Sequence, residues 1–246
     1  MSEESVANDS AYVAWKGWVD TVPFGELDAG ERQYFRAELK KVIRSGPQIR
    51  TVLEIGYGNG TFLAYCREQG WDAVGTELDA ELVAAGAKAG YSVFPADQSD
   101  KFDNQSFDLI VILDVLEHIP QDDIVGFLST LGEKLRPGGR MLMRFPNADS
   151  WLGNPLQNGD PTHVTAIGYL KMTYFALQSS LRIVSFTGAR RRGFKTSVLH
   201  GIYNVTAGPL LRINAAIKRV LYFPFLPVVL WTSNVVCVVV SDPRKR

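Results

Sequence analysis

Short apolar runs alternate with helical stretches through most of this chain, and this alternation restricts the fold more than any other feature. A continuous apolar run such as residues 107–113 is typical of a strand buried on both faces of a parallel sheet. Strands and helices alternating at crossover spacing predict an α/β fold with a doubly wound, Rossmann-like sheet of seven mostly parallel strands. The predicted strands are residues 50–56, 73–78, 92–96, 107–113, 140–145, 181–186 and 235–240.

Helical stretches precede and separate these runs. Residues 11–45 are predicted to form one or two helices, which end at the Gly-Pro pair 46–47. Further helices are expected at 61–69, from the capping residue Asp79 to about residue 90, and at 121–135. The candidate buried positions of the first stretch are Trp15, Trp18, Tyr34, Phe35, Leu39 and Val42.

This pattern divides the chain into four regions. Residues 1–48 form an N-terminal helical cap, and residues 49–188 form the Rossmann-like core. Residues 189–233 are a basic and apolar helical insertion before the last strand. Residues 234–246 are the closing strand with a basic tail.

Charge and cysteine usage limit the location and partners of the protein. The 246 residues include 26 basic and 26 acidic side chains, so no overall field favours nucleic acid. Cys66 and Cys237 lie inside apolar runs without metal or redox spacing, which suits a reducing cytoplasm. The acidic start lacks the apolar run of a secretory signal. We expect a cytoplasmic protein that does not bind nucleic acid.

The stretch VLEIGYGNG at 52–60 places three glycines, Gly56, Gly58 and Gly60, directly after the first strand. A Walker loop would need Gly-Lys-Ser/Thr, and a dinucleotide loop would need the spacing G-x-G-x-x-G. Glu54, two residues ahead of the first glycine, would repel a pyrophosphate. The same carboxylate favours the sulfonium and amino groups of S-adenosylmethionine, either directly or through water. The glycines allow the backbone to approach this ligand closely.

Acids at the next two strand ends extend this site. Glu77 can accept from both ribose hydroxyls, and Asp97 can accept from the adenine amino group. The alternative is that both acids only cap the segments that follow, but capping requires no register with a glycine loop. Leu78, Gln98 and Asp114 complete the predicted cofactor contacts.

The ordered motifs VLEIGYGNG, GTELD, PADQ, FDLIVILDVLEHI and LRPGGRMLMRFPN resemble those of class I S-adenosylmethionine-dependent methyltransferases, over residues 50–188. The N-terminal aromatic helix and residues 145–169 are also similar to methyltransferases encoded with bacterial surface-polysaccharide genes. The resemblance implies an S-adenosyl-L-methionine cofactor and O-methylation of a sugar or glycan hydroxyl. O-methylation of a lipophilic phenol or quinol, and a non-catalytic binding module in a biosynthetic complex, are the alternatives.

An alcohol acceptor requires a base for its proton. Only three histidines occur in the chain, and two of them follow the fourth and fifth strands, where this fold binds its acceptor. We expect His163 to be the general base, oriented by Asp160. His118, in the superfamily-typical LEHIP, is a further catalytic candidate, although such a histidine is usually structural. Amino-methylation is disfavoured because Asn/Asp-Pro-Pro-Tyr/Phe is absent after the fourth strand.

The predicted catalytic site contains no metal ion, but an alternative interpretation places a divalent cation there. If the chain turns helically after the fourth strand, Asp114, Glu117 and His118 share one face and, with His163, could hold Mg²⁺ or Mn²⁺. This arrangement resembles the Glu-x-x-Glu-His site of ubiquinone-pathway O-methyltransferases and of methyltransferases acting on small-RNA 3′ ends. The chain departs from that motif by having the shorter Asp114 at the first position.

The insertion combines cations with a long uncharged stretch. The cations near its start are Arg190, Arg191, Arg192 and Lys195. Residues 220–241 contain no charged side chain, and basic residues flank this stretch at 218–219 and 244–246. That length would span a membrane, but prolines at 224 and 227 interrupt a helix, and a span would remove the seventh strand. We therefore expect peripheral contact with a membrane surface. A packing or homodimer surface is the alternative.

Overall fold

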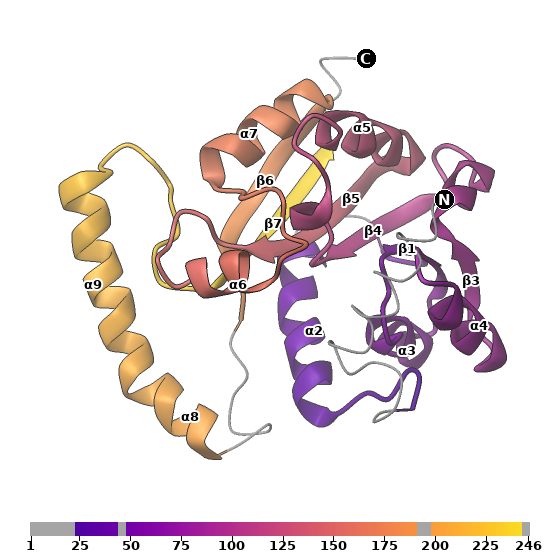
Figure 1. The fold of residues 1–246 in the computed structure, drawn as a ribbon, viewed down its shortest axis with the longest axis horizontal. Coiled ribbons are helices and arrows are strands. Elements are labelled where there is room, and N and C mark those ends of the chain that lie inside the picture. Colours follow the sequence, from indigo (N-terminus) through magenta and orange to yellow (C-terminus); the bar gives the residue numbers. More distant parts are fainter. Residues whose placement is uncertain (1–22, 44–47, 191–197, 243–246) are drawn as a thin grey trace.

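The computed structural model describes residues 23–43, 48–190 and 198–242. They contain one seven-stranded sheet in the order β3-β2-β1-β4-β5-β7-β6 (Figure 1). The first five strands are parallel, and β7 runs antiparallel to both of its neighbours. The predicted doubly wound, mostly parallel sheet is confirmed. The strands are β1 Thr51–Ile55, β2 Asp72–Glu77, β3 Ser92–Pro95, β4 Phe107–Leu113, β5 Leu135–Pro146, β6 Leu181–Gly188 and β7 Asn234–Ser241.

Helices cover both faces of the sheet and extend along one flank of the molecule (Figure 1). Side chains of α2 and α3 pack against one face, and side chains of α5 and α7 pack against the other. The helices are α2 Ala29–Ile43, α3 Thr61–Gln69, α4 Ala80–Lys88, α5 Ile124–Lys134, α6 Asn154–Gly159, α7 Tyr169–Gln178, α8 Val198–Val205 and α9 Ala207–Tyr222, with 3-10 turns η1 Ala96–Lys101 and η2 Leu116–His118.

The predicted start of a helix agrees with the structure where a nearby side chain caps that helix. Asp79 caps α4 as expected, since its carboxylate accepts a hydrogen bond from the Leu82 amide at 2.9 Å. Phe35, Leu39 and Val42 of α2 are buried as predicted, whereas Trp15 and Trp18 lie outside the described residues. Helix α5 begins three residues later than predicted, after a turn in which the Asp123 amide bonds the Pro120 carbonyl.

Three elements differ from the sequence prediction. Strand β5 begins at Leu135 rather than at residue 140, because Leu135 pairs with Phe107 ahead of a register shift. Helices α6 and α7 were not predicted, and they occupy the segment between β5 and β6. The segment before β7 contains α8 and α9. Within the described ranges, no helix combines the length and apolar character that crossing a membrane requires.

Candidate active site

A cavity of about 1180 Å³ opens at the carboxyl ends of the parallel strands. It includes the point where the strand order reverses between β1 and β4, which is the usual ligand site of open α/β sheets. Its volume is large enough for a cofactor together with an acceptor. One part of its wall comes from the ends of β1 and β2, and another from the end of β5 and the segments after β4 and β5. The first part includes Glu54, Gly56, Tyr57, Gly58, Glu77 and Leu78, and the second includes Asp114, His118, Arg144, Leu152 and Thr162.

The glycine loop depends on a conformation that other residues rarely adopt. Gly56, Gly58 and Gly60 all have positive φ, between 52° and 71°. A Cβ on Gly60 would also collide with the ring of Phe24. The loop is therefore folded tightly against the protein, and at Gly56 and Gly58 it offers bare backbone to the cavity.

Glu77 fixes this loop from the neighbouring strand. One of its carboxylate oxygens accepts from the Gly58 amide at 2.9 Å, and the other accepts from the Leu78 amide at 2.7 Å. Burial raises the pKa of Glu77, and these backbone hydrogen bonds oppose that shift. The residue thus supports the loop and also lines the cavity.

Glu54 is a buried acid on the wall of the cavity. Its side chain is 2% exposed, and among the described residues no hydrogen-bond donor meets its Oε2. Burial, followed by the charge of Glu77, raises the pKa of Glu54 well above its ordinary value. A buried carboxylate oxygen without a donor requires a cation or a hydrogen-bond donor from a ligand. The ammonium and sulfonium groups of S-adenosylmethionine satisfy that requirement.

Some of the other predicted cofactor residues line the cavity, and others do not. Leu78 and Asp114 line the cavity, as Gly56 and Gly58 do. Asp97 is exposed on η1, and the described cavity wall reaches Ala96 but not Asp97 or Gln98. Gly60 shapes the loop from outside that wall. Adenine contacts by Asp97 and Gln98 therefore stay a prediction.

Asp114 does not share a face with Glu117 and His118, so the condition of the four-residue metal alternative is not met. The residue has φ 57° and precedes η2, so the chain does not turn helically there. Its carboxylate accepts from Arg144, at 2.8 Å from Nε and with a second, shorter contact from Nη2. Asp114 therefore forms a two-point ion pair and is not a candidate metal ligand.

Sequence reasoning placed Arg144 on the acceptor side without giving it a role, and it missed Tyr34 as part of this site. Arg144 Nη1 donates to the Tyr34 hydroxyl at 3.1 Å, and both residues line the cavity. Burial would lower the pKa of Arg144, but Asp114 and Tyr34 raise it, and the net shift is upward. The available signal was a charged residue inside an apolar strand. Helix α2 thus supplies a wall of the cavity as well as a cap over the sheet.

The loop that carries His163 is attached to η2 through the backbone. The Val164 and Thr165 amides donate to the Glu117 carbonyl at 2.9 and 3.0 Å. This attachment brings the rings of His118 and His163 together, with centroids 4.6 Å apart and planes at 73°. The two histidines are therefore neighbours.

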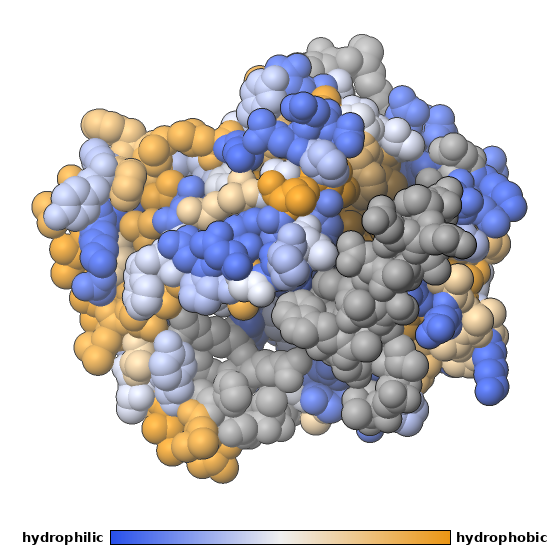
Figure 2. Space-filling model, in the orientation of Figure 1, coloured by the Kyte–Doolittle hydropathy of each residue, from blue (hydrophilic) through white to orange (hydrophobic). Residues whose placement is uncertain are grey.

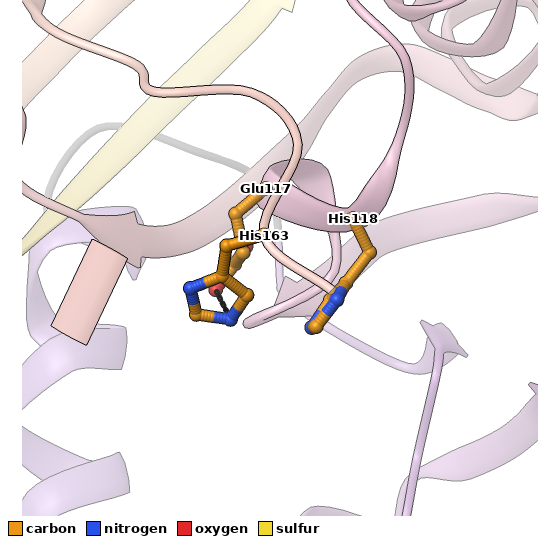
Figure 3. A group of neighbouring side chains, drawn as sticks. All are labelled: Glu117, His118 and His163. Atoms are coloured by element: carbon orange, nitrogen blue, oxygen red, sulfur yellow. Dashed lines mark ion pairs between the residues drawn. The ribbon is translucent and has the colours of Figure 1, made fainter. Parts of the chain in front are cut away.

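Glu117, His118 and His163 form one compact group (Figure 3). Each contributes a ligand atom, and these atoms all lie within 4.8 Å of one another. His163 Nε2 is 3.5 Å from Asp160 Oδ2 and 4.0 Å from Glu117 Oε1. Two imidazoles and a carboxylate at this spacing are a donor set that suits a divalent cation.

His118 and His163 differ in access to the cavity. His118 lines it, whereas His163 is 8% exposed and does not belong to its described wall. His118 Nδ1 lies 2.9 Å from the Thr162 hydroxyl, which donates to Asp160 at 2.6 Å. Because that hydroxyl proton is committed to Asp160, the Thr162 oxygen accepts from Nδ1–H, and Nε2 becomes the basic nitrogen of His118. Asp160 therefore orients His118 through Thr162, while its other oxygen faces His163.

Comparison with known proteins decides the family. A family model described as a methyltransferase domain matches residues 28–190, which is more than half of the chain. This chain belongs to that methyltransferase family. The methyltransferase uses S-adenosyl-L-methionine as its methyl donor, in agreement with the predicted cofactor.

Sequence relatives and solved structures add narrower similarities. The methyltransferase is 25% identical over 100 residues to a ubiquinone biosynthesis O-methyltransferase of Aliivibrio fischeri, covering 37% of this chain and 42% of the relative. It is 29% identical over 97 residues to the protein of that name from Paramagnetospirillum magneticum, covering 36% and 37%. The matches thus span less than half of these relatives. A SAM-dependent methyltransferase from Archaeoglobus fulgidus shares the fold, with TM-score 0.62, 18% identity and coverage of 85% and 93%.

Proposed function

We propose that this methyltransferase methylates a hydroxyl oxygen of a lipophilic phenol or quinol. The observation that carries the proposal is the group formed by Glu117, His118 and His163 next to the cavity. A phenolic hydroxyl becomes a good nucleophile once its proton is removed, and this group offers either a base or ligands for a cation. The similarity to two ubiquinone biosynthesis O-methyltransferases supports the same acceptor class.

The chemistry needs few groups from the protein. S-adenosyl-L-methionine supplies an electrophilic methyl group. Glu54 and Glu77 would hold the cofactor's cationic and hydroxyl groups, and the glycine loop would permit its close approach. His118 Nε2 accepts the proton of the acceptor hydroxyl, and Thr162 with Asp160 fixes the ring through Nδ1. The products are a methyl ether and S-adenosylhomocysteine, with the proton left on His118.

The base assignment differs from the sequence expectation. We assign the base role to His118 because it lines the cavity, and we assign His163 a supporting position behind it. The alternative is that Glu117, His118 and His163 bind Mg²⁺ or Mn²⁺, which would lower the pKa of the acceptor hydroxyl directly. A chelator distinguishes the two roles, since only the second requires a cation.

A sugar or glycan hydroxyl, our first expectation, is the second candidate acceptor. Trp151 is 62% exposed and stands next to Leu152, which lines the cavity. An exposed indole beside an acceptor site offers an apolar face for a sugar ring. A role in polysaccharide biosynthesis would follow from this acceptor.

Acceptor class can be tested with two compounds of matched alkyl tail and a third that lacks the tail. Purified enzyme with labelled S-adenosyl-L-methionine is offered an alkyl catechol, an alkyl glucoside and the short catechol without a tail. We expect methylation of the alkyl catechol and a higher KM for the short catechol. Methylation of the glucoside alone would replace the phenol proposal with the glycan one. Failure with all three, while S-adenosylhomocysteine still binds, would exclude both acceptor classes.

We also propose a cytoplasmic location with contact at the inner face of the membrane. A lipophilic phenol dissolves in lipid, and a glycan under assembly can be carried on a lipid, so either acceptor would be met at a membrane. The insertion before β7 is basic and rich in apolar residues, which suits such contact. Helices α8 and α9 supply the exposed apolar side chains of this insertion.

A further inference from the structure

Helices α8 and α9 and the residues after them carry an unusual exposed surface. Thirteen of the 21 large hydrophobic side chains that are exposed on the described chain lie within residues 198–225. Figure 2 shows hydrophobic residues gathered along this flank of the molecule. We call residues 198–225 the α8–α9 arm. A contiguous apolar surface of this kind marks an interaction site.

The apolar face of α9 points away from the protein. Ala215 is buried, and the Arg212 guanidinium lies 4.4 Å above the Trp231 ring, so this side of the helix faces the body. Helical spacing places the opposite side at positions 210, 213, 217, 220 and 221. Those positions carry exposed leucine, isoleucine and valine: Leu210, Ile213, Ile217, Val220 and Leu221. Ordinary surface helices have the reverse polarity, with apolar residues facing the core.

Little of the described chain covers this face. Among the named elements α8 is the main packing neighbour of α9 (Figure 1). Phe225, just after α9, is 94% exposed. The arm therefore presents its hydrophobic side chains on a flank and not in a groove between helices.

Charge identifies the partner. Residues 189–241 contain no aspartate or glutamate, whereas cations occur on the arm and just before it. Arg212, Lys218 and Arg219 belong to α9, and Arg190 precedes α8, while Arg191, Arg192 and Lys195 lie outside the described residues. A second copy of the chain would bring cation against cation with no acid to pair. An anionic lipid surface complements both the charge and the apolar face.

We propose that the α8–α9 arm inserts into the interface of an anionic lipid bilayer. Tyr203 of α8 and Arg190 also line the cavity, so the arm is part of the cavity wall. Docking would bring that wall to the lipid surface, and an acceptor with a lipid tail would reach the site from the bilayer. This last step rests on the proposed function, but lipid binding by the arm does not.

Vesicle co-sedimentation of the full chain tests the proposal. The vesicles contain phosphatidylcholine with or without phosphatidylglycerol, and neither cofactor nor acceptor is added. We expect binding to the phosphatidylglycerol vesicles at low salt and weaker binding at high salt, because salt screens the cations. Replacing Lys218 by glutamine should lower the partition coefficient about fivefold, because each cation near an anionic surface contributes about 1 kcal/mol. The double variant Leu210→Ser, Ile217→Ser should abolish binding.

Matched variants elsewhere separate arm effects from general ones. Leu170→Ser on α7 removes an equally exposed leucine, and Lys88→Gln on α4 removes an exposed cation. Both should bind like the wild type, and equal melting temperatures would show that all variants fold. Absence of wild-type binding, or binding unchanged in the arm variants, would overturn the proposal. A wild-type dimer that becomes monomeric in Leu210→Ser, Ile217→Ser would identify a second copy as the occupant. Because no methyl transfer is measured, failure of the acceptor assay leaves this result intact.

Discussion

The Glu77 carboxylate, at the end of β2, accepts a hydrogen bond from the amide of Gly58 in the glycine loop, at 2.9 Å. One side chain thereby links the loop after β1 to the neighbouring strand. It also places a carboxylate on the cavity wall beside backbone that a ligand can approach. Loop geometry and cofactor recognition are therefore coupled through Glu77.

Substitution of Glu77 separates these two roles. Glu77→Ala should weaken S-adenosylhomocysteine binding roughly 10- to 100-fold, because each hydrogen bond to a charged group is worth about 1.5–3 kcal/mol. Glu77→Gln keeps an oxygen for the Gly58 amide and should weaken binding less. Calorimetry measures both affinities. Equal affinity for wild type and Glu77→Ala would place the ribose elsewhere.

Glu54 predicts a pH dependence of cofactor binding. Its pKa is raised in the ligand-free protein by burial and by Glu77, and a bound cation would lower that pKa again. At pH values between the pKa of Glu54 in the bound protein and its pKa in the ligand-free protein, cofactor binding releases a proton. In that pH range the affinity for the cofactor rises by up to about tenfold per pH unit. Calorimetry in two buffers of different ionisation enthalpy detects the released proton. Glu54→Gln should bind more weakly and show no proton release from this position.

The same shift has the opposite effect on stability. Because the folded-state pKa of Glu54 lies above its unfolded value, the folded protein binds the proton more tightly. The ligand-free enzyme should therefore lose stability as pH rises from the unfolded-state pKa of Glu54 to its folded-state pKa. The Glu54→Gln variant should lose less stability over the same pH range. Thermal melts from mildly acidic to neutral pH check the sign. A melting temperature that rises with pH more steeply in the wild type than in Glu54→Gln would contradict it.

His118 and His163 should differ when each is replaced by alanine. His118→Ala should lower kcat about 10²- to 10⁴-fold with cofactor affinity nearly unchanged, because a general base acts on the reaction and not on the cofactor. His163→Ala should cost less, since His163 lies behind His118. If the group binds a cation, a chelator stops the wild type, Mg²⁺ or Mn²⁺ restores it, and both variants lose activity together. Cofactor affinity falling in step with activity would instead indicate a structural role.

Asn147 should matter for stability more than for acceptor binding. It is fully buried, and its Nδ2 donates to the carbonyls of Val229 and Thr232 at 2.6 and 3.0 Å. Asn147→Ala leaves two buried carbonyls without this donor, which costs about 3 kcal/mol. A loss of that size should lower Tm by roughly 6–12 °C in a chain of this length. A Tm within about 2 °C of the wild-type Tm corresponds to a loss of about 1 kcal/mol or less. That result would show that water replaces the amide.

Local sequence signals were sufficient for the sheet and the glycine loop. The apolar run 107–113 and its neighbours have strand character that does not depend on distant contacts, and the crossover spacing restricts their order. Asp79 caps α4 through a residue three positions away, so its role was readable as well. The boundary of β5 was less readable, because Leu135 joins the strand through pairing with Phe107.

The sequence by itself determined the fold class, the loop, and the acids Glu54 and Glu77 at adjacent strand ends, since periodicity and turn chemistry act over a few residues. Tertiary structure alone decided the partners within the acceptor side. Asp114 pairs with Arg144, 30 positions away, and Arg144 reaches Tyr34 over 110 positions. Access to the cavity separated His118 from His163. Such choices depend on which distant segments pack together and on the positive φ of Asp114, and neither is encoded in a local pattern.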